Sequence, residues 1–141
     1  MTTQKILNQV ATHLSGRPVT VRVQPPAWDF AGGCAWKTLE GWAIIDVDPG
    51  TRDPLDTLLH EIAHIKYDWR SMTPTDLWKS KPGSLKATSE ERAKLRTLPR
   101  EGKAASQVGT WKRYAIENCW RYPGDNVFEK QLNSLMAYKE S

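Results

Sequence analysis

Hydrophobic residues recur at helical spacing near the start of the chain and then alternate with polar residues along the next stretch. Between residues 3 and 15 the apolar positions share one side of a helix, and Gly16 marks its end. These positions are Ile6, Leu7, Val10, Ala11 and Leu14. The following segment, "PVTVRVQPP", alternates valine with polar residues and closes on two prolines, which is typical of a half-buried strand. The pattern therefore predicts a helix over 3–15 and a strand over about 19–24.

Two further strands and a well-capped helix are predicted next. The stretch "CAWKTLEGWAIIDVD" has two apolar segments that flank a plausible hairpin turn at Glu40 and Gly41. Asp53 is a strong N-cap residue, and Pro54 suits the first position of a helix. We expect this helix to cover about residues 54–67. Its apolar face consists of Leu55, Leu58, Leu59 and Ile62.

The second half of the chain is more polar. Residues 70–98 are rich in Ser, Thr, Pro and Lys, and we interpret them as a basic surface insertion with one short helix near 88–95. Pro99 suits the first turn of a long helix that reaches about residue 121, and Asp125 caps a last helix. This order predicts one α+β domain over residues 1–141. In it a small three-stranded sheet packs on the helix at 54–67, and further helices follow toward the C-terminus.

Composition and charge narrow the classes of protein. The chain is 39% hydrophobic and 26% charged, as in ordinary globular proteins, and no run of about 18 apolar residues predicts a membrane span. The N-terminus lacks the features of a secretory signal, so we expect a cytoplasmic protein. Residues 66–121 carry 13 Lys and Arg against 6 Asp and Glu. This basic stretch could attract nucleic acid or an acidic partner. The simpler interpretation is a basic face that is only solvated.

The motif "HEIAH" at residues 60–64 carries the candidate chemistry. His60 and His64 are four residues apart, so on a helix they project from the same side and can bind one ion. Zn²⁺ accepts imidazole nitrogens at ~2.0–2.1 Å. Glu61 is rotated by about 100° from His60, which places its carboxylate beside the ion, where it can accept a proton from water. The motif therefore predicts a zinc site, and the alternative is two polar residues on a surface helix.

A third protein ligand has to come from a carboxylate, because no histidine follows His64. Glu101 is the first candidate, since it lies on the apolar face of its helix, where an unpaired carboxylate is costly. That face consists of Ala104, Ala105, Val108, Trp111, Ala115 and Cys119. The simpler interpretation is that Glu101 interacts with the helix dipole. Glu129 is the second candidate, and a surface ion pair explains Glu117.

At these residues the chain resembles a known family. "LLHEIAHIKYDW" resembles the active-site helix of the ImmA/IrrE-type zinc metallopeptidases, small zincin-like proteins common in phages and mobile elements. In that family a later helix carries a Glu-x-x-Ala pattern, and here "REGKAASQVGTW" offers Glu101 and Ala104. The resemblance implies that His60, His64 and Glu101 bind zinc and that Glu61 is the general base. It also implies a protein or peptide substrate, with a repressor or another regulatory protein as an example.

Two functions follow as hypotheses. The first is a zinc-dependent peptidase that uses metal-activated water, with Tyr67, Tyr114 or a lysine of the insertion as the oxyanion donor. An extended substrate would add to the edge of the sheet, and the insertion would act as a lid or a binding surface. The second is a non-catalytic zinc module that binds nucleic acid or a protein through its basic stretch. In that case Cys119 would be a fourth ligand.

Overall fold

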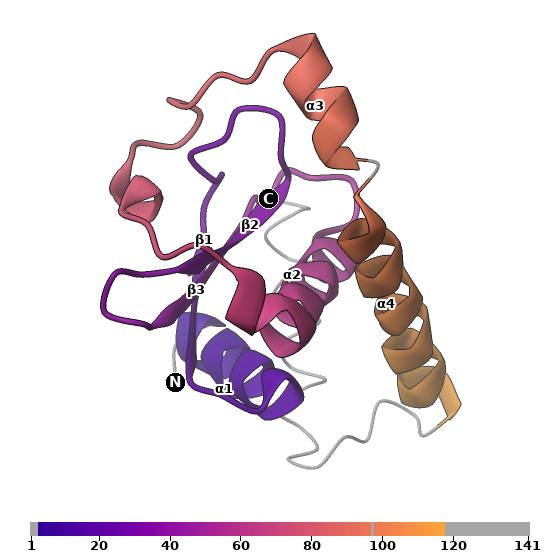
Figure 1. Ribbon diagram of the computed structural model, residues 1–141. Helices are drawn as coiled ribbons and strands as arrows, with labels where there is room; N and C mark the ends of the chain where they lie inside the picture. Colours follow the sequence, from indigo (N-terminus) through magenta and orange to yellow (C-terminus); the bar gives the residue numbers. More distant parts are fainter. Residues whose placement is uncertain (1–2, 97, 118–141) are drawn as a thin grey trace.

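Three short strands form one mixed sheet in the computed structural model, which describes residues 3–96 and 98–117 (Figure 1). The strands are β1 (Val19–Val23), β2 (Gly33–Lys37) and β3 (Ala43–Val47). β3 is central, because it pairs in parallel with β1 and antiparallel with β2. The sequence predicted three strands without their order. The observed order places β2 at an edge of the sheet.

Helices pack on this sheet and on one another. The helices in the described ranges are α1 (Thr3–Ser15), α2 (Pro54–Asp68), α3 (Ser89–Arg96) and α4 (Pro99–Glu117), and the short 3₁₀ turns η1 (Trp69–Ser71) and η2 (Leu77–Lys79) precede α3. α1 and α2 cover one face of the sheet, and α4 lies beside α2 (Figure 1). The core between them includes Leu7, Leu14, Val21, Ile45, Leu58, Leu59 and Ile62. The predicted α+β class is therefore confirmed.

Local signals in the sequence explain where two of these elements begin and turn. The Asp53 side chain accepts the N–H of Asp56 at 3.1 Å and caps α2, whose first residue is Pro54. Gly41 turns the β2–β3 hairpin with φ of +86°, a conformation that glycine adopts without steric cost. Both the capped helix and the hairpin were predicted from these residues, and both are confirmed.

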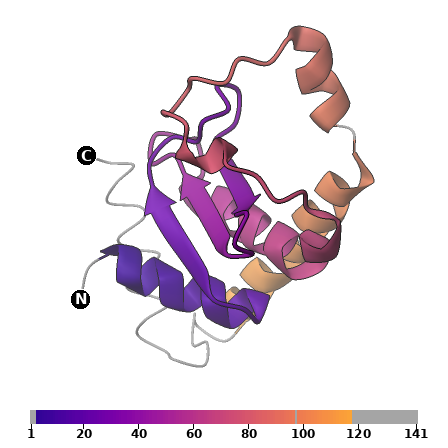
Figure 2. The same cartoon turned by 60° about the vertical axis from the view of Figure 1, so that its left-hand side comes forward.

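The other face of the sheet is covered by the segment between η1 and α3, which passes over the strands in Figure 2. Trp78 and Leu85 of this segment pack against Trp36 and Ile44, and Leu85 also pairs with Trp28 in an isolated bridge. The predicted short helix near 88–95 is present as α3. The prediction of a surface insertion was incomplete, because part of the segment is a layer of the fold. Its few apolar residues are too widely spaced to produce a periodic pattern.

A buried ion pair connects the sheet to this covering segment. Asp46 on β3 is 1% exposed and accepts hydrogen bonds from Nε and Nη2 of Arg22, at 2.6 and 2.8 Å. It also accepts from Trp36 Nε1 at 2.9 Å, and Arg22 donates to the Trp78 carbonyl at 2.9 Å. Removing one partner of such a pair leaves an uncompensated charge, which costs about 3–5 kcal/mol. The network therefore holds three strands and the segment in one arrangement.

The long helix expected from Pro99 begins at that residue, and its described part ends at Glu117. The helix expected from Asp125, which carries Glu129, lies outside the described residues, as does Cys119. Among the helices in the described ranges, none has the combination of length and hydrophobicity that crossing a membrane requires.

Candidate metal centre

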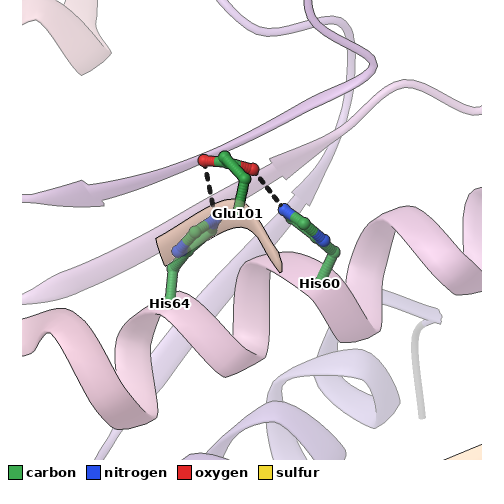
Figure 3. Close-up of side chains that lie close together, drawn as sticks. All are labelled: His60, His64 and Glu101. Carbon is green, nitrogen blue, oxygen red and sulfur yellow. Dashed lines mark hydrogen bonds and ion pairs between the residues drawn. The ribbon is translucent and has the colours of Figure 1, made fainter. Parts of the chain in front are cut away.

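Helices α2 and α4 bring His60, His64 and Glu101 together (Figure 3). His60 Nε2 lies 2.6 Å from Glu101 Oε2, and His64 Nε2 lies 3.1 Å from Glu101 Oε1. One potential ligand atom from each residue lies within 4.8 Å of the other two. In Figure 3 the carboxylate stands between the two imidazoles, which rise from successive turns of α2. The cluster therefore comes from residues that are close on one helix and from a residue far away in sequence.

The packing of α4 on α2 places the carboxylate. Ala104 and Val108 are buried, and Val108 belongs to the same core as Leu58 and Ile62 of α2. Glu101 lies one turn before Ala104, so it stands over the same side of α4 and reaches the histidines. Ala105 was expected on this face, but it is exposed. The side chains of Trp111, Ala115 and Glu117 lie outside what the structure describes.

The donor set fits zinc. Two imidazole nitrogens and a carboxylate oxygen are ligands that Zn²⁺ accepts, and ligands of a tetrahedral ion lie about 3.4 Å apart at the usual bond lengths. The two His–Glu separations, 2.6 and 3.1 Å, run to different oxygens of the carboxylate and are shorter than that, because the imidazoles contact the carboxylate directly. Binding an ion between them requires the Glu101 carboxylate, whose side chain is 32% exposed, to move away from the imidazoles. The three residues could therefore hold a metal ion.

Asp68 orients one of the imidazoles, a role that the sequence pattern did not indicate. His64 Nδ1 lies 2.6 Å from Asp68 Oδ2, at the end of α2. Because a carboxylate accepts, Nδ1 carries the hydrogen, and Nε2 is left to face Glu101. Such a carboxylate–histidine pair fixes the tautomer and the ring orientation of a metal ligand. The available signal was the four-residue spacing between His64 and Asp68 on one helix.

Glu61 is buried beside the cluster and is not part of it. Only 9% of the residue is exposed, and the backbone of Ala35 on β2 hydrogen-bonds its carboxylate. Burial raises the pKa of Glu61 above its usual value, although the nearby imidazoles of His64 and His60 partly oppose this. Buried carboxyl groups with raised pKa values occur often at functional sites, where they can accept and donate protons.

The direct contact between His64 and Glu101 shifts the pKa of both groups. Burial disfavours the charged form of His64, but its hydrogen bonds with Glu101 and Asp68 and the charge of Glu61 outweigh this effect. Together they raise the pKa of His64 to about 9. Hydrogen bonds from His60 and His64 lower the pKa of Glu101 far below its usual range. The site is therefore built to hold a carboxylate against positive charge.

A cavity of about 270 Å³ opens onto this cluster. Glu61, His64 and Glu101 line one side of it, and Trp28, Phe30 and Met72 supply apolar walls. The cluster therefore faces a space large enough for a substrate side chain and water.

The expected oxyanion donors do not border this space. The Tyr67 hydroxyl donates to Gln107 Oε1, and Lys66 and Lys103 lie over the Tyr67 ring, so Tyr67 is held against α4. No lysine of the insertion is among the described residues that line the cavity. The side chain of Tyr114 lies outside the described part.

Comparisons with protein-family models, with curated proteins and with solved structures find no match to this chain. The resemblance to ImmA/IrrE-type peptidases therefore stays a prediction. The geometry supports its coarser part, a His-Glu-x-x-His helix joined by a glutamate from a distant helix.

Proposed function

We propose that this protein is a zinc-dependent peptidase in which His60, His64 and Glu101 hold the ion and Glu61 is the general base. The observation that carries the proposal is the convergence of these three side chains within 4.8 Å, two of which, His64 and Glu101, line an open cavity. Catalytic zinc sites use three protein ligands and keep a further position open, whereas structural sites are closed by four. Two histidines and a glutamate form one of the known catalytic sets.

Zinc bound here would act as a Lewis acid that polarises a carbonyl and makes water more acidic. Glu61 then accepts a proton from the attacking water and delivers it to the leaving amine, for which its buried position and raised pKa are suited. Asp68 keeps His64 in the tautomer that presents Nε2 to the ion. Each residue thus has a role that its position supports.

The edge of β2 is the proposed binding site for an extended substrate. Thr38 and Gly32 hydrogen-bond toward β3, whereas the Lys37 carbonyl accepts from Thr75 outside the sheet, at 2.9 Å. Because the direction alternates along an antiparallel strand, Gly33 and Ala35 also direct their backbone groups outward. The Ala35 N–H donates to the Glu61 carboxylate, so an added peptide would pair with Gly33 and with the Ala35 carbonyl and would lie next to Glu61. The contact with Thr75 limits such a peptide to the start of β2.

Metal analysis and proteolysis of the purified full chain test the proposal. We expect about one zinc per chain and cleavage of a diverse peptide library, read out by mass spectrometry. Glu61→Gln should keep the zinc and lose cleavage by at least about 100-fold. Glu90→Gln, a change of the same kind at an exposed position on α3, should match the wild type. An active Glu61→Gln protein contradicts the mechanism, and unchanged zinc in Glu101→Ala contradicts the ligand set.

A non-catalytic zinc module that binds nucleic acid through the basic stretch is the alternative. Lys86 and Arg92, however, form ion pairs with Asp29 Oδ2, within 4 Å. Part of the positive charge of the basic stretch is therefore neutralised by a residue of the same chain. A salt-dependent shift of labelled DNA, together with no cleavage in the peptide library, would favour this alternative.

A further inference from the structure

We infer that Arg100 is the group that stabilises the oxyanion formed when a peptide carbonyl is attacked in this site. The inference rests on the proposed function and assigns a role to a residue that the sequence pattern did not indicate. Arg100 lines the cavity together with Glu61, His64 and Glu101, and it is the residue immediately before the proposed ligand on α4.

The geometry keeps Arg100 close to the reacting region but available. Its Nε lies 4.0 Å from Glu101 Oε1, and that oxygen is 3.1 Å from His64 Nε2. A separation of 4.0 Å is too long for a hydrogen bond, so the guanidinium is not locked onto the carboxylate. Its side chain is 47% exposed, which leaves it free to turn toward a bound substrate. A rotation of the Arg100 side chain would therefore bring its N–H groups to a substrate bound beside His64 and Glu101.

Among the described residues that line the cavity, Arg100 is the one with a permanent positive charge. The other ionisable residues there are Glu61, His64, Asp68, Glu101 and the thiol of Cys34. The carboxylates cannot donate to an oxyanion when they are ionised, and the nitrogens of His64 are engaged with Glu101 and Asp68. Arg100 also lies in the first turn of α4, where the helix dipole adds positive potential.

The step that needs this charge is the addition of water to the carbonyl carbon. The water oxygen forms a bond to that carbon, Glu61 takes a water proton, and the C=O π pair moves onto the carbonyl oxygen. Arg100 donates N–H to that oxygen while it carries the charge, and it gives up no proton because guanidinium stays protonated. The C=O bond then re-forms, the C–N bond breaks, and the nitrogen leaves with its electron pair and the proton from Glu61. Donors of this kind strengthen as charge develops, so they lower the barrier more than they improve binding.

A competing role is that Arg100 only balances the charge of Glu101. The two roles differ in what the loss of Arg100 would change. An oxyanion donor supports binding of an anion beside the metal, whereas a partner of Glu101 supports binding of the metal itself. Measuring both affinities in one variant separates the two.

The experiment uses the full chain loaded with Co²⁺, whose visible absorption reports ligand changes at the ion. Titration with inorganic phosphate, a tetrahedral anion, gives an anion affinity without any peptide substrate. Arg100→Gln should weaken phosphate binding about tenfold and leave Co²⁺ affinity within about twofold. Arg100→Lys, which keeps the charge but loses the forked donors, should fall between these two proteins. Arg70→Gln, at an exposed position that does not line the cavity, should match the wild type.

Each other outcome overturns the inference in a recognisable way. Equal phosphate affinity in wild type and Arg100→Gln, or a wild type that binds Co²⁺ but not phosphate, rejects the role of Arg100 and leaves the metal site standing. A loss of Co²⁺ affinity with unchanged phosphate binding makes Arg100 a partner of Glu101. A wild type that binds no Co²⁺ rejects the proposed function and this inference together. Once a cleaved peptide is found, Arg100→Gln should lower kcat by about 100-fold and change KM little.

Discussion

Replacing Gly33 by alanine tests the close packing of β2 against α2 that places Glu61. A Cβ atom at Gly33 would lie 2.5 Å from Thr57 Cγ2, 3.0 Å from the Asp46 carbonyl oxygen and 3.2 Å from Glu61 Cγ. The first of these is a clash, and the second involves central-strand backbone that cannot move independently. To admit one methyl group, Thr57 has to rotate and lose its hydroxyl hydrogen bond to the Asp53 carbonyl, or the strand and the helix have to separate.

The expected cost follows from these contacts. Overpacking of this kind costs about 1–3 kcal/mol, and alanine recovers up to about 1 kcal/mol by restricting the unfolded chain. We expect the free energy of unfolding of Gly33→Ala to fall by about 1–2 kcal/mol. Movement of α2 would also displace the Glu61 carboxylate from Ala35, so turnover should fall more than zinc affinity does.

Urea unfolding of the metal-free full chain, followed by tryptophan fluorescence, measures the change. Gly109→Ala is the matched control. It is a glycine to alanine change in α4 with nothing within 4 Å of the new Cβ, and it should stabilise the protein by about 0.5–1 kcal/mol. A Gly33→Ala protein as stable as the wild type would refute the close approach of β2 to α2.

Two further predictions concern the cluster of His60, His64 and Glu101. Asp68→Asn should weaken zinc binding by about 10- to 100-fold, because His64 loses the carboxylate that fixes its tautomer. Asp76→Asn, at an exposed position, should leave zinc affinity unchanged. Competition with a chelating dye measures both affinities, and equal affinities would argue against the orienting role of Asp68. In the metal-free protein, the pKa of His64 is raised from 6.5 to about 9. The protonated imidazole therefore stabilises the folded state fully below pH 6.5, and this stabilisation is lost as the pH rises to about 9. Urea midpoints over this range should fall more in the wild type than in His64→Ala, and parallel curves would contradict the raised pKa.

Much of the fold could be predicted because its signals are local. The Asp53–Pro54 pair sets the start of α2 through one hydrogen bond, and the turn at Gly41 is decided by the backbone of a few residues. The amphipathic pattern of residues 3–15 likewise needs no distant partner to be recognised. The strand order could not be predicted in this way, since β1 pairs with β3 and not with β2, the strand that follows it in the sequence. The packing of the covering segment on the sheet was also not predicted, because it depends on contacts of its apolar residues with the cluster that includes Trp36 and Ile44, which are distant in sequence.

For the candidate site, the sequence by itself determined that His60 and His64 share one side of a helix with Glu61 next to them, because helical geometry sets the positions of residues a few places apart. Only the tertiary structure decided which carboxylate, among those described, joins them. The packing of α4 on α2 brings Glu101 to the imidazoles across 41 positions of sequence. The same packing turns Tyr67 toward Gln107 and leaves Arg100 at the cavity. Spacing along one helix is a property of the chain, whereas contact between two helices depends on how their buried faces fit.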